Sequence, residues 1–322
     1  MMGPDVVRSM ISKTLRATDF PQLGTMQKGK VRDSYVQGNR RYIVATDRIS
    51  AFDVVLGTVP FKGQILNQMA SYWFEQTKDI APNHVLDVPD PAVTVAKDCR
   101  PLPLEMVVRA YLTGSSSTSI WRAYERGDRV FCGHDLPDGM SRHQRLDRPL
   151  VTPSTKAEIG EHDRSVSRAE VLAMGLVTEQ QFDEMADYAM ALFALGQRIA
   201  AERGLILVDT KYEFGLEGSG RILLIDEIHT PDSSRYWYLD SYEGDFSAGR
   251  NPRALDKEFV RRYLRDELGY SGQGEPPVLP DDLVVEAAMR YAGLFEEVTG
   301  RPFDPNKEDP ETRIRRNLGL TA

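Results

Sequence analysis

The chain of 322 residues contains 41% apolar and 27% charged residues and has a formal net charge of −8. This length suits one large or two smaller globular domains, and the acidic balance argues against a surface that coats nucleic acid. Two distant cysteines, Cys99 and Cys132, and five scattered histidines exclude a structural zinc knot and fit a reduced chain. No apolar run approaches a membrane span and residues 1–20 lack the apolar core of a signal peptide, so we expect a soluble cytoplasmic protein.

Residues 29–53 predict a β-hairpin that is entered through a glycine, GKVRDSYVQGNRRYIVATDRISAFD. Side chains alternate from residue 31, a Gly-Asn pair marks the turn, and residues 41–45 form the return strand. A glycine beside clustered cations allows backbone N–H groups and side chains to close on phosphates, although a solvated basic hairpin is an equally good interpretation. The candidate nucleotide-binding residues are Gly29, Lys30, Val31 and Arg32.

Asp47 begins the unusual segment DRISAFD, in which charged residues surround an isoleucine and a phenylalanine. Charged residues where a strand meets a loop often bind ligands, which makes Asp47 a candidate for substrate binding. A salt bridge with Arg48 in a turn explains the same pair equally well.

The segment LPLEMVVRAYLTGSS, residues 102–116, predicts a buried strand that ends in small hydroxyl residues. An apolar strand of this kind could offer its backbone to an adenine edge, and we expect this of Glu105, Met106 and Val107. Arg109 and Ser115 near its end could hold a phosphate or a carboxylate. A core strand followed by a serine turn is the alternative.

Residues 152–167, TPSTKAEIGEHDRSVS, form a polar loop without an apolar stripe. Long polar loops on compact domains are often functional lids, and a mobile surface loop is the alternative. Its candidate substrate-binding residues are Lys156, Glu158, His162 and Asp163. The next segment, residues 178–203, predicts a long helix with a capping box at its start and Gly204 at its end.

The two apolar runs LILVDTKYEF and RILLIDEIH, joined by a turn that contains glycine, predict a central hairpin. Lys211 and Glu213 share one face because residues two apart in a strand point the same way. If Leu216 pairs with Arg221, Lys211 lies opposite Asp226 and Glu213 lies diagonal to it. The pattern therefore predicts a lysine and two carboxylates on one face.

Two hard oxygen ligands beside a lysine suit Mg²⁺ and a polyphosphate, because Mg²⁺ is usually held by one or two carboxylates and substrate phosphates. An ordinary Lys–Asp cross-strand salt bridge with an incidental glutamate is the alternative. A register slip of one residue would exchange Asp226 for Glu227.

Residues 256–269 predict a helix whose first turn contains Lys257. A cation there opposes the helix dipole, and this misfit makes Lys257 a candidate ligand group. A final helix is predicted over residues 282–299, and the polar tail from Arg301 is expected to fray.

Seven segments in chain order resemble the SAICAR synthetase family of purine biosynthesis, over residues 28–265 and in its longer form: GKVRDSY, DRISAFD, LEMVVRAYLTGSS, STKAEIGEHD, LVDTKYEFG, LIDEIHTPDSSRYW and DKEFVRRYL. The resemblance implies an α+β fold of two lobes. A small, mostly antiparallel β domain, residues 1–109, would cover a nucleotide cleft against a larger α/β domain, residues 110–322, similar to that of ATP-grasp enzymes and protein kinases.

The resemblance also implies an ATP-dependent ligase. It would condense 5-amino-1-(5-phospho-D-ribosyl)imidazole-4-carboxylate with L-aspartate through an acyl phosphate, giving SAICAR, ADP and phosphate. Lys211, Glu213 and Asp226 would be catalytic, with Mg²⁺ on the two carboxylates beside ATP. Arg109, Ser115 and Arg235 match the positions that hold the ribonucleotide, and Ser234 is a further, lesser candidate. The expected partners are small molecules only, and we expect a monomer, with a homo-oligomer as the alternative.

Two rival functions remain to be compared with this one. A phosphotransferase of the kinase type requires the motif HRDxxxxN, but neither His134-Asp135 nor His162-Asp163 is followed by asparagine at that spacing. A nucleotide-binding module without catalysis predicts loss of the metal carboxylates, and both are present.

Overall fold

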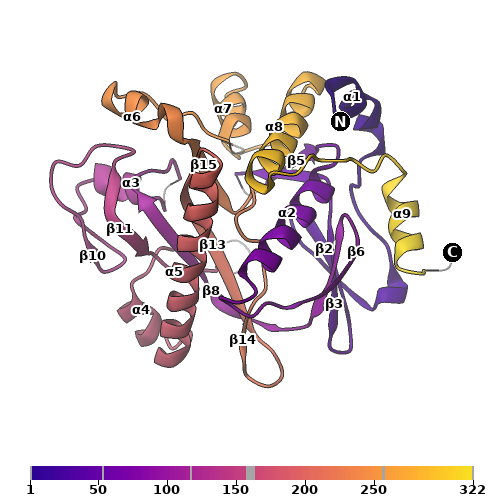
Figure 1. Ribbon diagram of the computed structural model, residues 1–322, viewed down its shortest axis with the longest axis horizontal. Coiled ribbons are helices and arrows are strands. Elements are labelled where there is room, and N and C mark those ends of the chain that lie inside the picture. Colours follow the sequence, from indigo (N-terminus) through magenta and orange to yellow (C-terminus); the bar gives the residue numbers. More distant parts are fainter. Residues whose placement is uncertain (1, 53, 117, 157–163, 256–257, 321–322) are drawn as a thin grey trace.

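The computed structural model describes residues 2–52, 54–116, 118–156, 164–255 and 258–320. Two antiparallel sheets form its framework, and helices pack on and between them (Figure 1). This mixed arrangement confirms the predicted α+β class, because helices and antiparallel strands both contribute to one large apolar core.

The first sheet has five strands in the order β1-β2-β3-β7-β6, all antiparallel to their neighbours. Gln37 pairs with Arg40 across the Gly-Asn turn, so the predicted hairpin is confirmed. The bounds are β1 Thr25–Lys28, β2 Arg32–Gln37, β3 Arg40–Ala45, β6 Val85–Asp90 and β7 Val93–Lys97, and a separate pair contains β4 Arg48–Ala51 and β5 Val54–Thr58.

The second sheet has the order β11-β8-β13-β14, with β12 added beside β8 and β15 beside β13. Its two long strands, β8 and β13, are antiparallel, and Lys211 lies opposite Val107 while Glu213 lies opposite Glu105. The bounds are β8 Arg100–Tyr111, β11 Arg145–Val151, β12 Ser154–Thr155, β13 Leu205–Leu216, β14 Ile222–Leu224 and β15 Ser234–Tyr238.

Helix α5, Glu179–Glu202, covers one face of the second sheet and contacts both β13 and β8 (Figure 1). The predicted capping box is confirmed, since the Thr178 hydroxyl accepts from the Gln181 N–H and the Gln181 side chain accepts from the Thr178 N–H. Its buried residues, among them Phe182, Met185 and Leu192, follow the predicted apolar stripe. The helix therefore leaves only the opposite face of the sheet open to ligands.

Among the remaining helices, α2 packs between β3 and α8. Residues 130–150 form a small excursion with β9 Val130–Phe131, β10 His134–Asp135 and an apolar cluster of its own around Leu136 and Leu146. The helices are α1 Pro4–Met10, α2 Lys62–Thr77, α3 Ile120–Glu125, α4 Arg168–Ala173, α6 Leu239–Ser247, α7 Glu258–Asp266, α8 Asp281–Thr299 and α9 Pro310–Asn317, and there are 3₁₀ turns at Ile11–Lys13 and Pro21–Leu23.

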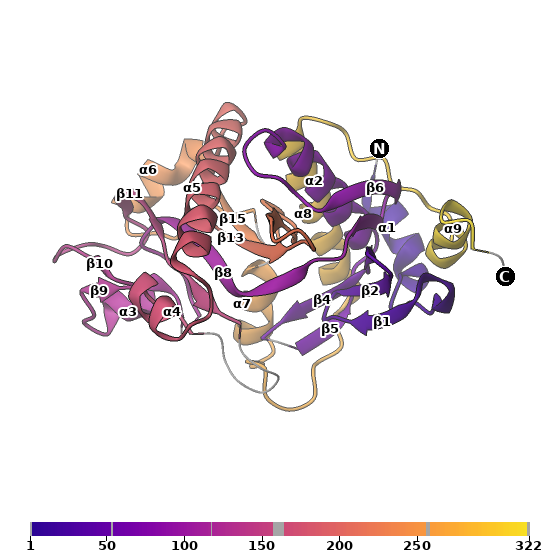
Figure 2. The same ribbon diagram turned by 90° about the horizontal axis from the view of Figure 1, so that it is seen from below.

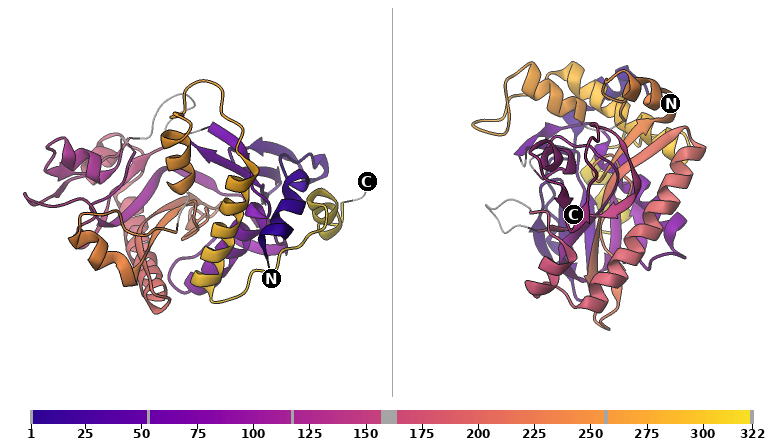
Figure 3. Two further views of the ribbon diagram at one scale, coloured as in Figure 1. Left: turned by 90° about the horizontal axis from the view of Figure 1, so that it is seen from above. Right: turned by 90° about the vertical axis from the view of Figure 1, so that its left-hand side faces the viewer.

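The expected domain boundary at residue 109 falls inside β8, which crosses the middle of the molecule (Figure 2). Helices α8 and α9 also return from the second half of the sequence: α8 packs against α1 and α2, and α9 packs against β6 (Figure 3). The two halves of the sequence are thus interleaved, and one apolar core extends through both.

The expectation that the tail from Arg301 frays is wrong. Asp309 caps α9 by accepting from the Thr312 N–H at 2.9 Å. Arg313 and Asp90 form a buried ion pair with donor–acceptor distances of 2.9 and 3.1 Å, and their side chains are 1% and 0% exposed. A polar helix is therefore held by a buried charge pair that its sequence pattern does not reveal.

We predict that Arg313→Met lowers the free energy of unfolding by about 3–5 kcal/mol, because it leaves the Asp90 carboxylate buried without its main partner. The double change Asp90→Asn/Arg313→Met should recover part of this loss, since it removes both charges. Urea denaturation measures both effects, with Arg316→Met at an exposed position of α9 as the control. Equal stability of the parent and Arg313→Met proteins would contradict the assigned role.

Candidate functional site

The central hairpin forms with a register one residue away from the predicted one. Leu216 pairs with Ile222, not with Arg221, so the prediction of the register is wrong. Asp226 nevertheless reaches Lys211, because β14 ends at Leu224 and the chain bends at residue 226. The expected exchange of Asp226 for Glu227 does not occur, since the bend changes which side chain faces β13.

A lysine surrounded by carboxylates occupies the open face of the second sheet. The Lys211 ammonium donates to Asp226 Oδ2 at 2.9 Å and to Glu213, and it lies 3.4 Å from Glu105 Oε1. Lys156, at the start of the polar loop, also donates to Glu213. The structure thus brings together the three residues that the sequence nominated for catalysis and adds Glu105 and Lys156 to them.

Opposite charges in this cluster hold one another in the charged form. Burial alone would raise the pKa of Asp226, but Arg32 and Lys211 outweigh it and keep that pKa well below its ordinary value. Burial would lower the pKa of Lys211, but Asp226, Glu213 and Glu105 together raise it well above its ordinary value. At neutral pH the site is therefore a set of paired ions.

The glycine turn that joins β1 to β2, residues 29–31, leads into the hairpin of β2 and β3. It lies beside the cluster, because Arg32 at the start of β2 forms an ion pair with Asp226. The hairpin is fixed from behind by Arg48, which donates to the carbonyl oxygens of Gly29 and Lys30 at 2.9 Å and pairs with the fully buried Asp33 at 2.8 Å. Arg48 is a positioning residue that sequence reasoning had paired with Asp47.

A cleft of about 360 Å³ opens between the hairpin and the second sheet. Its described walls combine apolar side chains, such as Ile43, Pro101 and Ile225, with the charged groups Lys28, Arg32, Glu213 and Asp226. An apolar wall that leads to charged groups suits a ligand with a flat aromatic part and a charged tail.

The expectation that an adenine pairs with the backbone of Glu105, Met106 and Val107 needs correction. Strand β8 is paired with β13 along one edge and with β11 and β12 along the other, and the Val107 carbonyl already accepts from the Thr152 N–H at 2.7 Å. The Met106 side chain is fully buried. The cleft instead borders β8 at Pro101 and the preceding Cys99, so of these three residues only Glu105 reaches the cluster, through its carboxylate.

A second charged group lies on the same face of β13, two residues before Lys211. Asp209 pairs with Arg109 of β8 and Arg235 of β15 in the sheet, and its carboxylate lies 3.7 Å from Arg109 Nη1 and 2.9 Å from Arg235 Nη1. Arg109 also donates to the Thr152 hydroxyl at 3.0 Å. The predicted grouping of these two arginines is therefore observed, with Asp209 between them.

Arg235 and Ser115 both line a larger pocket of about 870 Å³ that begins at this end of the sheet. The rise of about 3.3 Å per strand residue separates Asp209 from Glu213 by roughly 13 Å along the same face. An anionic ligand in the pocket and a second one in the cleft can therefore meet near Lys211, which lies midway between these two positions.

Two sequence candidates for substrate binding face the interior instead. Ser234 pairs with Thr210 and its hydroxyl donates to the Thr210 hydroxyl at 2.7 Å, which places it on the face opposite to Arg235. Asp47 accepts from the backbone N–H groups of Leu15 at 2.8 Å and Gly63 at 3.0 Å, so it holds the start of α2. Both residues have structural roles here.

Four further candidates, Glu158, His162, Asp163 and Lys257, lie outside the described residues. Lys30 is described and exposed on the hairpin, and the Val31 carbonyl accepts from the Thr46 N–H at 3.1 Å, next to the cleft. Of the four hairpin candidates, Gly29 and Arg32 line the cleft, and Lys156 is the candidate of the polar loop that the structure describes.

A buried network that the sequence did not indicate supports the site from behind. Lys62 is fully buried and donates to Asp232 at 2.8 Å, and the Tyr291 hydroxyl donates to the same carboxylate at 2.6 Å. These three side chains join α2, the segment after β14 and α8. In the sequence, only the lysine at the start of an apolar helix could have indicated this network, and that pattern is too common to predict a buried contact.

The donor chemistry of the cluster fits Mg²⁺. Asp226 and Glu213 both contact the Lys211 ammonium, so their oxygens converge on one small region, and carboxylate oxygens are hard ligands. Among the described residues no group of three or more His, Cys, Asp or Glu side chains is arranged to hold a metal by itself. A metal ion here would need oxygen atoms from a ligand as well.

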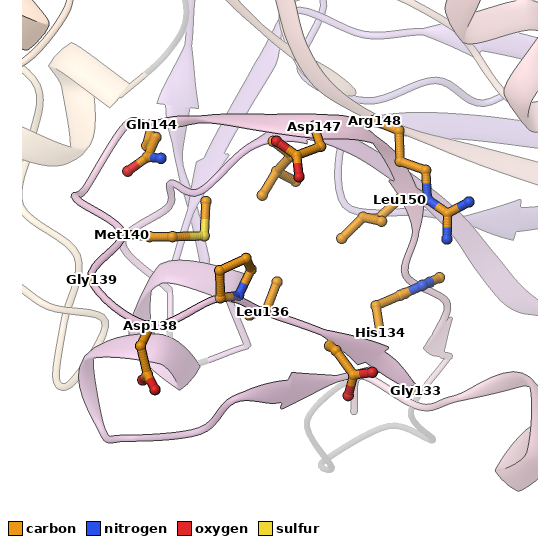
Figure 4. A pocket seen from close by; sticks show the side chains of 13 residues that line it. Gly133, His134, Leu136, Asp138, Gly139, Met140, Gln144, Asp147, Arg148 and Leu150 are labelled. Atoms are coloured by element: carbon orange, nitrogen blue, oxygen red, sulfur yellow. The ribbon is translucent and has the colours of Figure 1, made fainter.

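The excursion contains a separate cavity of about 510 Å³ (Figure 4). Asp138 and Asp147 border it, and the His134 ring lies 2.8 Å from the Val151 carbonyl oxygen, a contact that ties the excursion to β11. Asp138 is already paired with Arg129. This cavity therefore shows no catalytic grouping.

No helix in the described part of the chain is both long and apolar enough to cross a bilayer.

Comparison with known proteins identifies relatives over nearly the whole chain. The family model described as SAICAR synthetase matches residues 25–277. A protein of Mesorhizobium japonicum named putative phosphoribosylaminoimidazole-succinocarboxamide synthase 2 is 50% identical over 95% of this chain and 98% of its own length. The phosphoribosylaminoimidazole-succinocarboxamide synthase of Legionella pneumophila, strain Lens, is 47% identical over 94% of this chain and 97% of its own length.

A solved structure of the SAICAR synthase of Saccharomyces cerevisiae in complex with SAICAR is similar to the model. It has a TM-score of 0.77 and 29% identity, and the match covers 90% of this chain and 100% of that one. A SAICAR synthetase structure in complex with ADP, at 21% identity and a TM-score of 0.65, shares the fold.

We predict that the contribution of Asp47 to the free energy of unfolding decreases as pH rises, because burial raises its pKa to about 6. The folded state then binds its proton more tightly than the unfolded state, so this contribution to stability is full below about pH 4 and is lost as pH rises to about 6. Relative to Asp47→Asn, the parent protein should lose about 2.4 kcal/mol between pH 4 and pH 7.

Urea denaturation of both proteins across this pH range measures the difference, and Asp19→Asn at an exposed position is the control. A difference that stays constant with pH, or one that grows in the opposite direction, would show that Asp47 titrates normally.

Proposed function

The chain belongs to the SAICAR synthetase family, and from this premise we propose how its residues carry out the family's reaction. It is an ATP-dependent ligase of purine biosynthesis that condenses 5-amino-1-(5-phospho-D-ribosyl)imidazole-4-carboxylate with L-aspartate, giving SAICAR, ADP and phosphate. The observation that carries the residue assignment is the cluster of Lys211 with Glu213 and Asp226, between the cleft and the pocket.

The chemical problem is that a carboxylate does not react with an amine, because oxide would have to leave. Transfer of the γ-phosphoryl group from ATP to the carboxylate makes an acyl phosphate, and the aspartate amine then displaces phosphate from it. The site must neutralise crowded negative charge, align two reactants and exclude water. A set of fixed cations on one rigid sheet face meets the first two requirements.

Lys211 is proposed to contact the transferred phosphoryl group or the reacting carboxylate. Its ammonium is held by carboxylates on two strands, so its position does not depend on substrate. Glu213 and Asp226 would hold Mg²⁺, which when bound supplies charge neutralisation to the phosphate oxygens. In the described structure the two carboxylates are neutralised by three side-chain cations, Arg32, Lys156 and Lys211.

This arrangement implies an exchange of partners when the nucleotide binds. Arg32, which lines the cleft, contacts Asp226, and Lys156 at the start of the loop contacts Glu213. A polyphosphate would attract these cations away from Asp226 and Glu213 and leave the carboxylates to the metal. Gly29, Lys30, Val31 and Arg32 are proposed to line its path.

The ribonucleotide is proposed to lie across the other end of β13, with its phosphate towards Arg109, Ser115 and Arg235. A guanidinium suits this role because its planar fork donates two parallel hydrogen bonds to an oxyanion. Lys257 is proposed to assist there, since its chain neighbours Leu255 and Phe259 both line the pocket. The imidazole carboxylate would then extend towards Lys211.

L-Aspartate is proposed to bind on the side of the polar loop, through Lys156, Glu158, His162 and Asp163. The supporting observation is the contact of Lys156 with Glu213, which brings the start of that loop to the reacting centre. An amine held there would lie close to the carboxylate that Lys211 contacts.

We also propose that the chain acts as a monomer in the cytoplasm. Both described cysteines are free thiols, as in a reducing compartment, and the exposed large apolar side chains, Val278 and Leu239 among them, are far apart in the sequence. A relative from Arabidopsis thaliana is named as chloroplastic, so the compartment differs within the family.

Phosphate release from MgATP with the aminoimidazole ribonucleotide, measured with and without L-aspartate, tests the function. We expect phosphate that depends on aspartate and equals the new ultraviolet-absorbing product one to one. Phosphate release without amide formation would contradict the acceptor chemistry.

We predict that Asp226→Asn and Glu213→Gln each lower kcat by about 100-fold or more, because each removes charge that is needed in the transition state. The control is Glu217→Gln, which removes a carboxylate paired with Lys97 in the turn between β13 and β14 and should keep the parent rate. Binding of Mn²⁺ together with ADP, followed by electron paramagnetic resonance, should weaken in the first two variants only. Parent kinetics in either variant would refute its role.

Arg109→Lys should raise the KM for the ribonucleotide about 10-fold or more and leave the KM for ATP nearly unchanged, because lysine keeps the charge but loses the planar fork. Steady-state kinetics with each substrate varied in turn measures both constants. Equal increases in the two KM values would place Arg109 outside the ribonucleotide site.

A further inference from the structure

The 870 Å³ pocket has an unusual concentration of positive charge. Among the described residues that line it there are seven arginines and no aspartate or glutamate. The whole chain, by contrast, has a net charge of −8. The arginines are Arg122, Arg142, Arg235, Arg253, Arg262, Arg265 and Arg290.

The proposed ribonucleotide site accounts for only one end of this pocket. Arg235 and Ser115 lie there, next to Asp209 on the sheet. The other arginines come from α3, from the excursion, from the segment after α6 and from α7 and α8. The pocket therefore continues beyond the sheet for the length of a second ligand, within the usual volume of a small-molecule site.

Several of these guanidinium groups are held in place without a ligand. Arg253 lies 4.2 Å from the centre of the Tyr238 ring, and Arg290 lies 4.2 Å from the centre of the Phe259 ring. Arg290 also donates to Glu286, which is not among the described lining residues. The aromatic faces are thus covered by cations, so they support charge and do not present a surface on which a base could stack.

Like charges repel, and an anion between them lowers the cost of gathering them along one wall. Carboxylates outside the lining offset part of this charge, in the pairs Arg122–Glu125, Arg253–Asp240, Arg265–Asp266 and Arg290–Glu286. Arg262 in the middle of α7 has an acidic neighbour, Asp266, whose pKa it helps to lower, but that carboxylate is paired with Arg265. Arginine is also the side chain that best matches phosphate oxygens, through two parallel hydrogen bonds.

We propose that the part of this pocket between α7 and α8 is a second anion site, distinct from the ribonucleotide site, and that it binds an oligophosphate group. Arg262 and Arg290 on these helices hold the anion, and Arg253 extends the same wall. The oligophosphate is either a free inorganic chain or the phosphate chain of a nucleotide whose base projects towards solvent. The inference rests on the proposed function only for the identity of the neighbouring site.

Equilibrium binding of inorganic tripolyphosphate to the full chain tests the proposal, by calorimetry in the presence of saturating MgADP, which fills the proposed nucleotide cleft. We expect one remaining site in the parent protein. Arg262→Gln/Arg290→Gln should weaken it roughly 30-fold or more, because two charge-assisted contacts are lost. Arg262→Lys/Arg290→Lys should retain part of the affinity, since the charge remains.

The matched control is Arg126→Gln/Arg168→Gln, which removes two exposed arginines elsewhere on the surface. Equal weakening in this control would mean a general charge effect and would overturn the proposal. So would a site that survives Arg262→Gln/Arg290→Gln but disappears in Ser115→Ala/Arg235→Gln, because it would then be the ribonucleotide site. Absence of binding to the parent protein would overturn it as well.

A second titration with ADP beyond the first bound equivalent identifies the source of the phosphate chain. Further ADP bound by the parent and lost in Arg262→Gln/Arg290→Gln supports the site with a nucleotide as its ligand. Binding of tripolyphosphate alone supports the site with an inorganic chain. Because these titrations do not require turnover, they remain readable even if the aspartate-dependent reaction is not observed.

Discussion

The pairing of Lys211 with carboxylates is the interaction on which the functional half of the molecule depends. The Lys211 side chain is partly withdrawn from water, and Glu213, Asp226 and Glu105, which stabilise its charge, arrive from three segments at once. The antiparallel pairing of β8 with β13 supplies Glu105 and Glu213 opposite each other, and the bend after β14 supplies Asp226. Sheet register and electrostatics therefore specify the same arrangement.

One strand organises both substrate sites because side chains two residues apart share a face. Asp209, Lys211 and Glu213 follow one another on the open face of β13, while Tyr212 and Phe214 pack on the other face, in the core. A rigid strand fixes the spacing between the arginine end and the carboxylate end better than loops could. Two cations from other segments, Arg32 after β1 and Lys156 after β12, reach the cluster from outside this strand.

Buried polar contacts join the parts of the chain that the sites require. Lys62, Asp232 and Tyr291 connect α2 with α8, and Arg313 with Asp90 fixes the C-terminal helix to the first sheet. Removing one partner from such a pair is costly, so these contacts specify one arrangement of the elements more strictly than apolar packing alone does.

The sequence by itself determined the elements with strong local signals: the hairpin at residues 32–45, the capped helix α5 and the shared face of Lys211 and Glu213. Seven motifs in order also indicated the family, and the matches to known relatives confirm it.

Tertiary structure alone decided the rest, because long-range contacts leave no periodic pattern in the sequence. It turned Ser234 and Asp47 inward, closed both edges of β8 to an adenine, and gathered arginines from distant segments into one pocket. It also kept Asp226 beside Lys211 despite a shifted register, because a bend, which pairing rules do not predict, redirects that side chain.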